Sequence, residues 1–397
     1  MEQEKHQYQV KRVIGLDVHP ECFSAGAVQT SIYKDADSQI LWVHNRVDMN
    51  DLENWMRKNT EANDLFILEA GSNSFETAAR IKSCDRKALV LESYRAGAIG
   101  KSYLKTDKED AVKLAKIYLS GLAHEVWIPD EKTREYREIF ASYKKAVKDN
   151  TRVRNRIWGW LNEHGIKNNK NISLLDDKRK EWILSCREWT VTQKEIIAVL
   201  LADLEYTNNK RNKLVKIIAA EVSTNKDMLN LLRLFGINKI TAFALKAIIG
   251  DITRFRNPKK LVAYLGLQPK VKESGNSAYS GSITYFGRKD VRAMLVECAH
   301  SILRTGSIDN SFAKWGRSLT FRKKGNVAVI AVARKLVVAV WYLLRGFFTQ
   351  LTEADETLKI KFTKLAIQIG KEWRNVLGYL TISDFVEDKI KLLQAGA

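Results

Sequence analysis

The chain has 397 residues, of which 45% are hydrophobic, and this length suggests two or three domains with buried cores. Its formal net charge of +20 favours a polyanionic partner, most often nucleic acid, over an anionic membrane surface or a basic protein without such a partner. No apolar run approaches the roughly 20 residues that span a bilayer, and the polar start MEQEKHQYQVKR lacks a signal-peptide core. The four cysteines form no CxxC pair, which argues against a disulfide framework or a zinc site. We therefore expect a soluble, intracellular protein that is not associated with a membrane.

Strand and helix patterns alternate in the first predicted domain, residues 1–128. Short apolar or β-branched runs predict strands at residues 10–19, 22–30, 38–45, 64–70 and 88–93. Helical spacing of apolar residues predicts helices at residues 49–58, 75–83 and 106–122. Three strands followed by alternating helix and strand predict an α/β domain with one mixed sheet.

The rest of the chain is predicted to be mostly helical. Residues 129–225 are rich in Lys, Arg and Glu with apolar residues at helical spacing, which predicts a helical hairpin or coiled coil that turns near 164–173. Residues 226–350 form a second compact domain, within which 270–290 is predicted to be a loop. Residues 351–397 are predicted to be a helical tail.

Four carboxylates in the first predicted domain follow a pattern that suits a metal site. Asp17 and Glu69 each end a predicted strand. Asp107 and Asp110 lie at positions i and i+3 of a predicted helix and share one of its faces. Taken singly, each acid can equally mark a strand exit or cap a helix. Held together they would repel one another unless a cation neutralised them, and their oxygens suit Mg²⁺ or Mn²⁺, so we predict a metal site for phosphoryl transfer.

The sequence resembles the DEDD-type transposases of insertion sequences, which are also called bridge-RNA-guided recombinases. GLDVH, LEAGS and KTDKEDA resemble that family's first domain, and DITRFRNPKKLVAYLGLQP, ESGNSAYSGSITYFGRKDVRAMLVECA and GNVAVIAVARKLV resemble its second, in the same order. The resemblance covers most of residues 10–345. It implies a RuvC-like, RNase H-like first domain, with the family's four acids at Asp17, Glu69, Asp107 and Asp110.

The resemblance also implies the nucleophile and the partners. In that family a serine of the second domain attacks DNA, and the matching residue is Ser274, which would form a covalent phosphoserine. From the residues alone, Ser274 would be taken as an ordinary loop serine, and other hydroxyls lie nearby at Ser277, Tyr279, Ser280, Ser282 and Tyr285. The implied partners are donor and target DNA, a structured bridge RNA that selects both by base pairing, and further copies of the chain in a dimer or tetramer. The resemblance also implies a cytoplasmic protein of a prokaryotic cell that is associated with the nucleoid when active.

Clusters of Arg and Lys are candidate contacts to the nucleic-acid backbone, because guanidinium and ammonium groups bind phosphates. They are Arg152, Arg154, Arg156, Lys210, Arg211, Arg288, Lys289, Arg292, Arg322, Lys323 and Lys324. A solvated basic surface is the equally simple interpretation of each.

Two other functions fit parts of the sequence. A metal-dependent, junction-resolving endonuclease that hydrolyses DNA with water would need the four carboxylates but not Ser274. A nucleic-acid-binding protein without activity would need neither, and the presence of all four acids argues against it.

Overall fold

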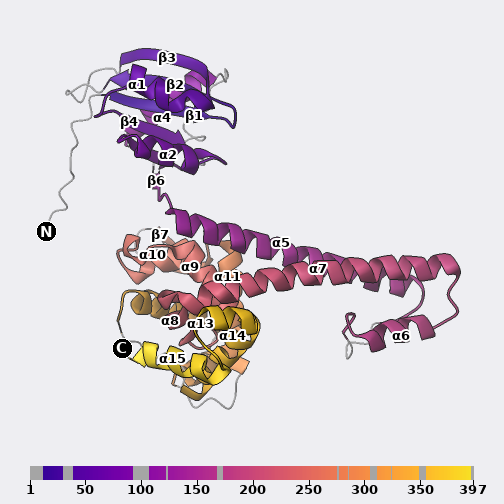
Figure 1. Cartoon of the computed structure of the whole chain (residues 1–397). Coiled ribbons are helices and arrows are strands. Elements are labelled where there is room, and N and C mark those ends of the chain that lie inside the picture. Colours follow the sequence, from indigo (N-terminus) through magenta and orange to yellow (C-terminus); the bar gives the residue numbers. More distant parts are fainter. Residues whose placement is uncertain are drawn as a thin grey trace. The chain divides into compact units, whose positions relative to one another are not determined.

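The computed structural model describes residues 12–29, 39–92, 107–121, 124–167, 173–274, 277–284, 286–304, 311–322, 324–347 and 355–394. The chain divides into two compact units, Met1–Pro129 and Asp130–Ala397, and each is considered by itself (Figure 1). The division lies next to residue 128, where the sequence analysis places the end of the first domain.

The first unit is built on a mixed six-stranded sheet in the order β3-β2-β1-β4-β5-β6. The strands are β1 (Arg12–Val18), β2 (Cys22–Gln29), β3 (Gln39–Asp48), β4 (Leu65–Glu69), β5 (Lys87–Leu91) and β6 (Glu125–Val126). β1, β2 and β3 form an antiparallel meander, β4 and β5 continue the sheet parallel to β1, and β6 pairs antiparallel with β5. The five predicted strands and the mixed sheet are confirmed, and the two-residue β6 is additional.

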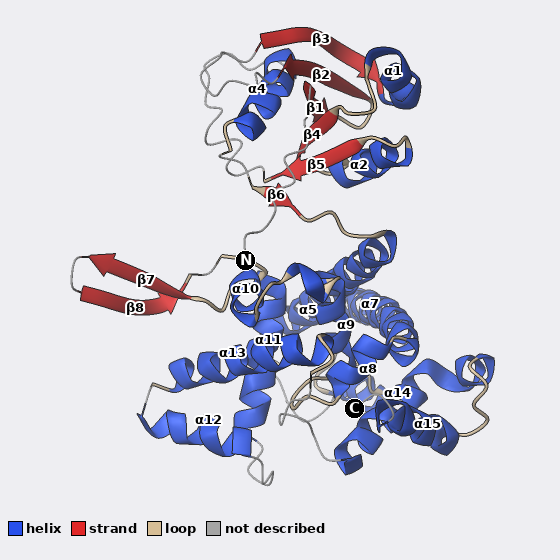
Figure 2. Ribbon diagram, turned by 90° about the vertical axis from the view of Figure 1, so that its left-hand side faces the viewer, coloured by secondary structure: helices blue, strands red, loops and turns tan. Residues whose placement is uncertain are grey.

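Helices cover both faces of this sheet (Figure 2). They are η1 (Met49–Asp51), α1 (Leu52–Asn59) and α2 (Ser74–Ser83) on one face and α4 (Asp107–Leu119) on the other. Because side chains alternate along a strand, Ile14 and Leu16 of β1 pack with Trp55 of α1, whereas Val13 packs with Val112 of α4.

The second unit is helical apart from one β-hairpin. Its elements are α5 (Glu131–Glu163), α6 (Asp177–Ser185), α7 (Val191–Thr224), α8 (Lys226–Leu232), α9 (Lys239–Ile249), η2 (Ile252–Arg254), α10 (Pro258–Tyr264), β7 (Pro269–Ser274), β8 (Ser277–Ile283), α11 (Lys289–Arg304), α12 (Ser311–Arg322), α13 (Gly325–Leu344), α14 (Asp355–Val376) and α15 (Ile382–Gln394). One hydrophobic core joins the base of α5 and α7 to the helices that follow. Phe362 of α14 and Phe385 of α15 are fully buried in it, so the predicted tail 351–397 shares a core with the two preceding segments.

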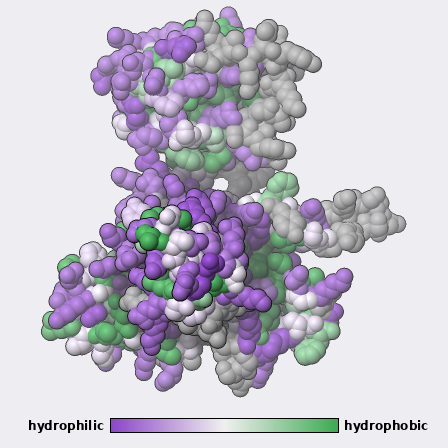
Figure 3. Space-filling model, turned by 90° about the vertical axis from the view of Figure 1, so that its right-hand side faces the viewer, coloured by the Kyte–Doolittle hydropathy of each residue, from purple (hydrophilic) through white to green (hydrophobic). Residues whose placement is uncertain are grey.

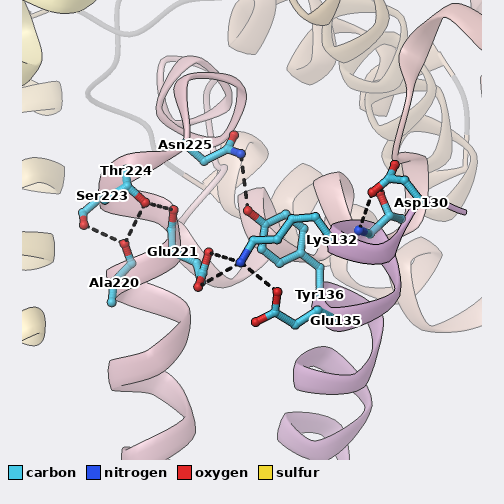
Figure 4. A network of polar contacts seen from close by, with 10 residues as sticks. Asp130, Lys132, Glu135, Tyr136, Ala220, Glu221, Ser223, Thr224 and Asn225 are labelled. Atoms are coloured by element: carbon cyan, nitrogen blue, oxygen red, sulfur yellow. Dashed lines mark hydrogen bonds and ion pairs between the residues drawn. The ribbon is translucent and has the colours of Figure 1, made fainter.

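The helices α5 and α7 form the predicted helical hairpin (Figure 1). Asp130 caps α5 by accepting a 2.8 Å hydrogen bond from the Thr133 backbone N–H. In the first turn, the Lys132 ammonium donates a 2.8 Å hydrogen bond to Glu135 and lies 3.3 Å from Glu221, which joins the start of α5 to the end of α7 (Figure 4). Lys132 and Glu135 are exposed and Glu221 is half-buried, so these ion pairs contribute little to stability.

The far end of this helical hairpin has a hydrophobic cluster of its own. Ile183 of α6, a helix that the sequence analysis did not predict, packs there with Ile157 of α5 and Leu200 of α7. Between this cluster and the main core, the buried Asn150 donates a 3.2 Å hydrogen bond to the Thr207 hydroxyl. The polar pair fixes the register of α5 against α7, because any other register would leave a buried amide without its partner.

The segment 270–290, predicted as a loop, contains the β-hairpin β7–β8 instead. Ser274 pairs with Ser277, and the two residues between them, Gly275 and Asn276, lie outside the described residues. Figure 2 shows the hairpin projecting from the helical part of the unit. The prediction missed it because its strands are largely polar and lack the apolar alternation that marks a half-buried strand.

Within the described parts of the chain, α13 is the one helix long and apolar enough to cross a membrane by length and composition. In the sequence this helix does not form one unbroken apolar run, because Arg334 and Lys335 interrupt it. Val332, Leu336 and Val340 of α13 are fully buried in the main hydrophobic core. A buried core helix of a globular protein can be as long and as apolar as a membrane-spanning helix.

Candidate functional site

Asp17 and Glu69 lie at the same edge of the first unit's sheet. β1 and β4 are parallel neighbours, and their register pairs Leu16 with Leu68, so the next residue on each strand is one of the two acids. Asp17 alternates with Gly15, and Glu69 alternates with Ile67, which pairs with Gly15, so both acids face the side of the sheet that α4 covers. The prediction that Asp17 and Glu69 lie at the ends of neighbouring strands is confirmed.

Two glycines let α4 rest directly on the strands beneath it. A Cβ atom on Gly15 would lie 1.9 Å from the Ala111 carbonyl oxygen, and one on Gly26 would lie 2.6 Å from a methyl group of Val112. Gly15 is two residues before Asp17 on the same face, and Ala111 directly follows Asp110. The close approach therefore positions the start of α4 beside the strand that carries Asp17.

Basic side chains already contact two of these carboxylates. The His19 Nε2 atom lies 3.5 Å from an Asp17 carboxylate oxygen, and the Lys113 ammonium lies 3.2 Å from Asp110. Asp107 is the first residue of α4, and its side chain lies outside the described residues. Among the side chains that are described, no three of His, Cys, Asp or Glu gather closely enough to bind a metal ion. The donors at this edge are carboxylate oxygens, which fit Mg²⁺ or Mn²⁺ rather than a thiolate-bound metal.

Ser274 is the last residue of β7, at the tip of the β-hairpin. Its side chain and those of Ser277, Tyr279 and Ser280 lie outside the described residues, as does the whole of Tyr285. The backbone pairing still shows how far each of these hydroxyl residues lies from the tip of the hairpin. Ser277 faces Ser274 across the turn, whereas Tyr279 and Ser280 pair with Lys272 and Val271 and so lie further from the tip, followed by the exposed Ser282.

The root of the hairpin is fixed by Arg292. Its side chain is 8% exposed and donates hydrogen bonds to the carbonyl oxygens of Gly266 (3.4 Å) and Phe286 (3.2 Å). Gly266 has a positive φ of 75° and Gly287 one of 84°, and a Cβ on either would lie within 2.4 Å of a backbone oxygen. Arg292 was predicted to contact nucleic acid. In the structure its guanidinium instead binds the backbone on both sides of the hairpin, at Gly266 and Phe286.

Asp290, in the first turn of α11, joins that helix to α5. It accepts hydrogen bonds from Arg288 (3.1 Å) and from Lys144 of α5. Burial is the largest single influence and by itself raises the pKa of Asp290, but the hydrogen bonds and positive charges of Arg288 and Lys144 outweigh it and lower that pKa to about 2. No local sequence pattern predicts this contact, because Lys144 and Asp290 are 146 residues apart.

We expect Asp290→Asn to destabilise the protein by about 2 kcal/mol at pH 7. Because folding lowers this pKa from 3.8 to about 2, the stabilisation is fully present above pH 4 and is lost as the pH falls through 2. Urea unfolding at several pH values measures the difference between the wild type and the variant, which should shrink towards zero near pH 2. The exposed Asp203, paired with Arg156 at 3.5 Å, provides the control, and Asp203→Asn should change stability by less than about 1 kcal/mol. Equal losses for both variants would contradict the expectation.

The other predicted nucleic-acid contacts are spread over the second unit. Those with exposed side chains are Arg152, Arg154, Arg156, Lys210, Lys289, Arg322 and Lys324, whereas Arg211 and Arg288 are half-buried and Lys323 lies outside the described residues. Arg152 and Arg156 pair with acids on the surface of the α5–α7 hairpin, at 2.9 and 3.5 Å. Figure 3 shows one face of the molecule, on which hydrophilic residues predominate.

Residues 228–314 match a family model described as Transposase IS116/IS110/IS902 family. The chain is similar to insertion-sequence transposases. The matched segment begins in α8 and ends in α12, so it includes the whole β7–β8 hairpin of this transposase-like chain. The transposase resemblance drawn from the sequence motifs is confirmed at this level.

Curated relatives extend the transposase similarity beyond that segment. The putative transposase y4qE of Sinorhizobium fredii is 25% identical over 70% of this chain and 75% of its own length. The transposase for insertion sequence element IS1111A of Coxiella burnetii is 26% identical over 62% of this chain and 68% of its own. The pilin gene-inverting protein of Moraxella lacunata is 25% identical over 353 residues, or 84% of this chain and 96% of its own. An alignment of that length exceeds Asp130–Ala397, so the similarity also reaches into the first unit.

Proposed function

We propose that this chain is a DNA transposase that cuts and rejoins strands through a covalent phosphoserine at Ser274, assisted by a metal site at Asp17, Glu69, Asp107 and Asp110. The observation that carries the proposal is the position of Ser274 at the tip of a projecting hairpin inside the segment that matches the transposase family model. The strand order of the first unit, an antiparallel meander continued by strands parallel to β1, supports an RNase H-like (RuvC-like) fold for the acidic domain.

The proposed covalent step exchanges one phosphate ester for another. The Ser274 oxygen attacks a DNA phosphorus and gives up its proton to solvent or a nearby base, while the bond from phosphorus to the leaving DNA oxygen breaks and that oxygen takes a proton. The reverse attack by a DNA hydroxyl restores the strand and frees Ser274. Because one ester replaces another, rejoining needs no external energy source, whereas hydrolysis by water would end the reaction at a break.

The carboxylates supply the negative charge that such a reaction needs to recruit a cation. Mg²⁺ or Mn²⁺, when bound, would stabilise the charge that develops on the phosphate and the leaving oxygen. Asp17 and Glu69 are placed by neighbouring parallel strands, and Asp110 is placed by α4 resting on Gly15. His19 and Lys113 now contact Asp17 and Asp110 and would have to release part of those contacts to a bound cation.

The proposal also names the partners of the chain. Donor and target DNA are the substrates, a structured bridge RNA selects them, and the protein acts as a homo-oligomer, either a dimer or a tetramer. The charge of +20 supports polyanionic partners. Val199 and Tyr206 of α7, which are 63% and 69% exposed and seven residues apart on one face of the helix, support a contact between copies along the α5–α7 hairpin.

A covalent-trapping assay tests the proposal. Full-length protein is mixed with Mg²⁺, the RNA of its element and end-labelled donor DNA, then denatured and separated on a gel. We expect a protein-linked DNA band that is lost in Ser274→Ala and kept in Ser277→Ala, the matched control across the same turn. Strand cleavage without a protein-linked band, unchanged in Ser274→Ala, would instead favour a junction-resolving endonuclease that uses water.

A further inference from the structure

A groove with a volume of about 750 Å³ lies at the foot of the β7–β8 hairpin. Its walls come from α10, α12, α13 and the first residue of β7, and apolar side chains such as Val262, Ala331 and Val338 form much of its lining. A space of this size is typical of sites for small organic ligands and is too small to admit a nucleic-acid duplex. The groove therefore suits a single nucleotide-sized group.

The polar side chains around the groove are almost entirely cationic. Lys259 and Lys260 of α10 and Arg334 of α13 line it, together with Lys335, and none of the described residues that line it is acidic. In the portion of the chain that the structure describes, Lys259, Lys260 and Arg334 form no ion pair, and all three are exposed. Lys335 differs, because its ammonium lies 4.4 Å from the centre of the Trp315 ring, which also borders the groove. An anionic ligand with an apolar, planar part complements this arrangement.

The groove is also tied to the hairpin that carries Ser274. Pro269, the first residue of β7, lines the groove, and Ser274 is the last residue of the same strand. At about 3.3 Å per residue, the strand carries the chain from the groove to Ser274 over roughly 17 Å. Along one DNA strand of B-form rise, that distance corresponds to about five nucleotides.

We propose that this groove binds an unpaired nucleotide of the DNA strand on which Ser274 acts. The base lies against the apolar walls beside Trp315, and Lys259, Lys260 and Arg334 bind the flanking phosphates. An unpaired base is required because a base within a duplex remains stacked and cannot enter a space of this size. This inference rests on the proposed function, which supplies the DNA strand, and it adds a second point of attachment that sets where along the strand the hairpin tip lies.

Binding of single-stranded DNA by the full-length protein tests the proposal without any cleavage. Fluorescence anisotropy with a labelled oligothymidylate, in buffer without divalent metal ions, compares Lys259→Ala/Lys260→Ala with Lys359→Ala/Lys371→Ala. The second pair removes the same charge from exposed positions of α14. We expect the first pair to weaken binding about tenfold and to reduce the slope of log K against log salt by about 1.4, since each single-strand phosphate contact contributes about 0.7. The control pair should change binding less than twofold.

Photocrosslinking locates the base. A 5-iodouracil within the same oligonucleotide should crosslink to Trp315 or its neighbours in the groove, as identified by mass spectrometry, and Arg334→Ser should reduce the yield. Equal effects of the two lysine pairs, or crosslinks only outside the groove, would overturn the proposal. Thymidine monophosphate competing as well as the oligonucleotide would assign the groove to a free nucleotide, and a preference for RNA of the same sequence would assign it to the RNA partner; either result overturns the assignment to a DNA strand. Because no cleavage is measured, failure here leaves the trapping result at Ser274 unaffected.

Discussion

Replacing Gly15 with alanine is expected to destabilise the first unit by about 3 kcal/mol or more. The added methyl group would lie 1.9 Å from the Ala111 carbonyl oxygen, and this neighbour is helix backbone that cannot rotate away. Either α4 must shift off the sheet or β1 must bend, and such overpacking typically costs 1–3 kcal/mol, with larger values where backbone must move. Thermal and urea unfolding of the full-length protein would measure the loss, and near-ultraviolet circular dichroism would report the displaced packing.

Gly71→Ala is the matched control for this substitution. Gly71 is also close to the acidic edge, two residues after Glu69, but a Cβ there would meet only the Glu69 carbonyl oxygen at 3.9 Å. We expect a change of less than about 0.5 kcal/mol for this surface position. If Gly15→Ala unfolded at the same denaturant concentration as Gly71→Ala, α4 would not rest on β1 as described, and the packing that brings the start of α4 to the strand of Asp17 would lose its support.

Replacing Asp17 with asparagine is expected to slow DNA cleavage about a thousandfold while leaving the fold intact. Asparagine has nearly the same shape but no charge, so the acidic edge would hold a divalent cation more weakly. Loss of several kcal/mol of charge stabilisation in the transition state corresponds to a rate decrease of this size. Single-turnover cleavage of donor DNA over a range of Mg²⁺ and Mn²⁺ concentrations measures it, with thermal unfolding to confirm the fold.

Asp48→Asn serves as the control for Asp17→Asn. Asp48 ends β3 and caps η1 by accepting a 2.8 Å hydrogen bond from the Asn50 backbone N–H, a role that asparagine performs equally well. Its cleavage rate should equal that of the wild type. A rate for Asp17→Asn within tenfold of the wild type, with the same dependence on metal concentration, would remove Asp17 from the proposed metal site.

The first unit was predictable from sequence because its signals are local and agree with one another. The strand that ends at Asp17 is a run of β-branched and apolar residues, and the helix bearing Trp55 has clear 3.6-residue spacing. The hairpin at Ser274 shows the opposite case. Ser274-Gly275-Asn276-Ser277 contains a two-residue turn signal, but the flanking polar strands gave no alternation to support it.

Other parts of the site depend on contacts that no local pattern encodes. The need for glycine at Gly15 arises only when α4 packs on it, and the pairing of Lys144 with Asp290 requires the path of α5 to be known. The cationic groove combines Lys259 with Arg334, which are 75 positions apart and meet only because α10 packs against α13. Arg292 was assigned to the wrong partner for the same reason, since its burial follows from the fold around Gly266.

The buried pair of Asn150 and Thr207 makes the α5–α7 hairpin a spacer of defined length. α5 has 33 residues and is about 50 Å long at 1.5 Å per residue. Tyr136 near its start lies in the main core and Ile157 near its end lies in the cluster around Ile183, about 30 Å further along the helix. Inserting seven residues into each helix adds two turns, so the distal cluster moves out by about 10 Å and keeps nearly the same orientation. Inserting two residues in each would rotate the distal cluster by roughly half a turn. The reach of this arm and the direction in which its end faces are therefore separately adjustable, in steps that leave both hydrophobic clusters intact.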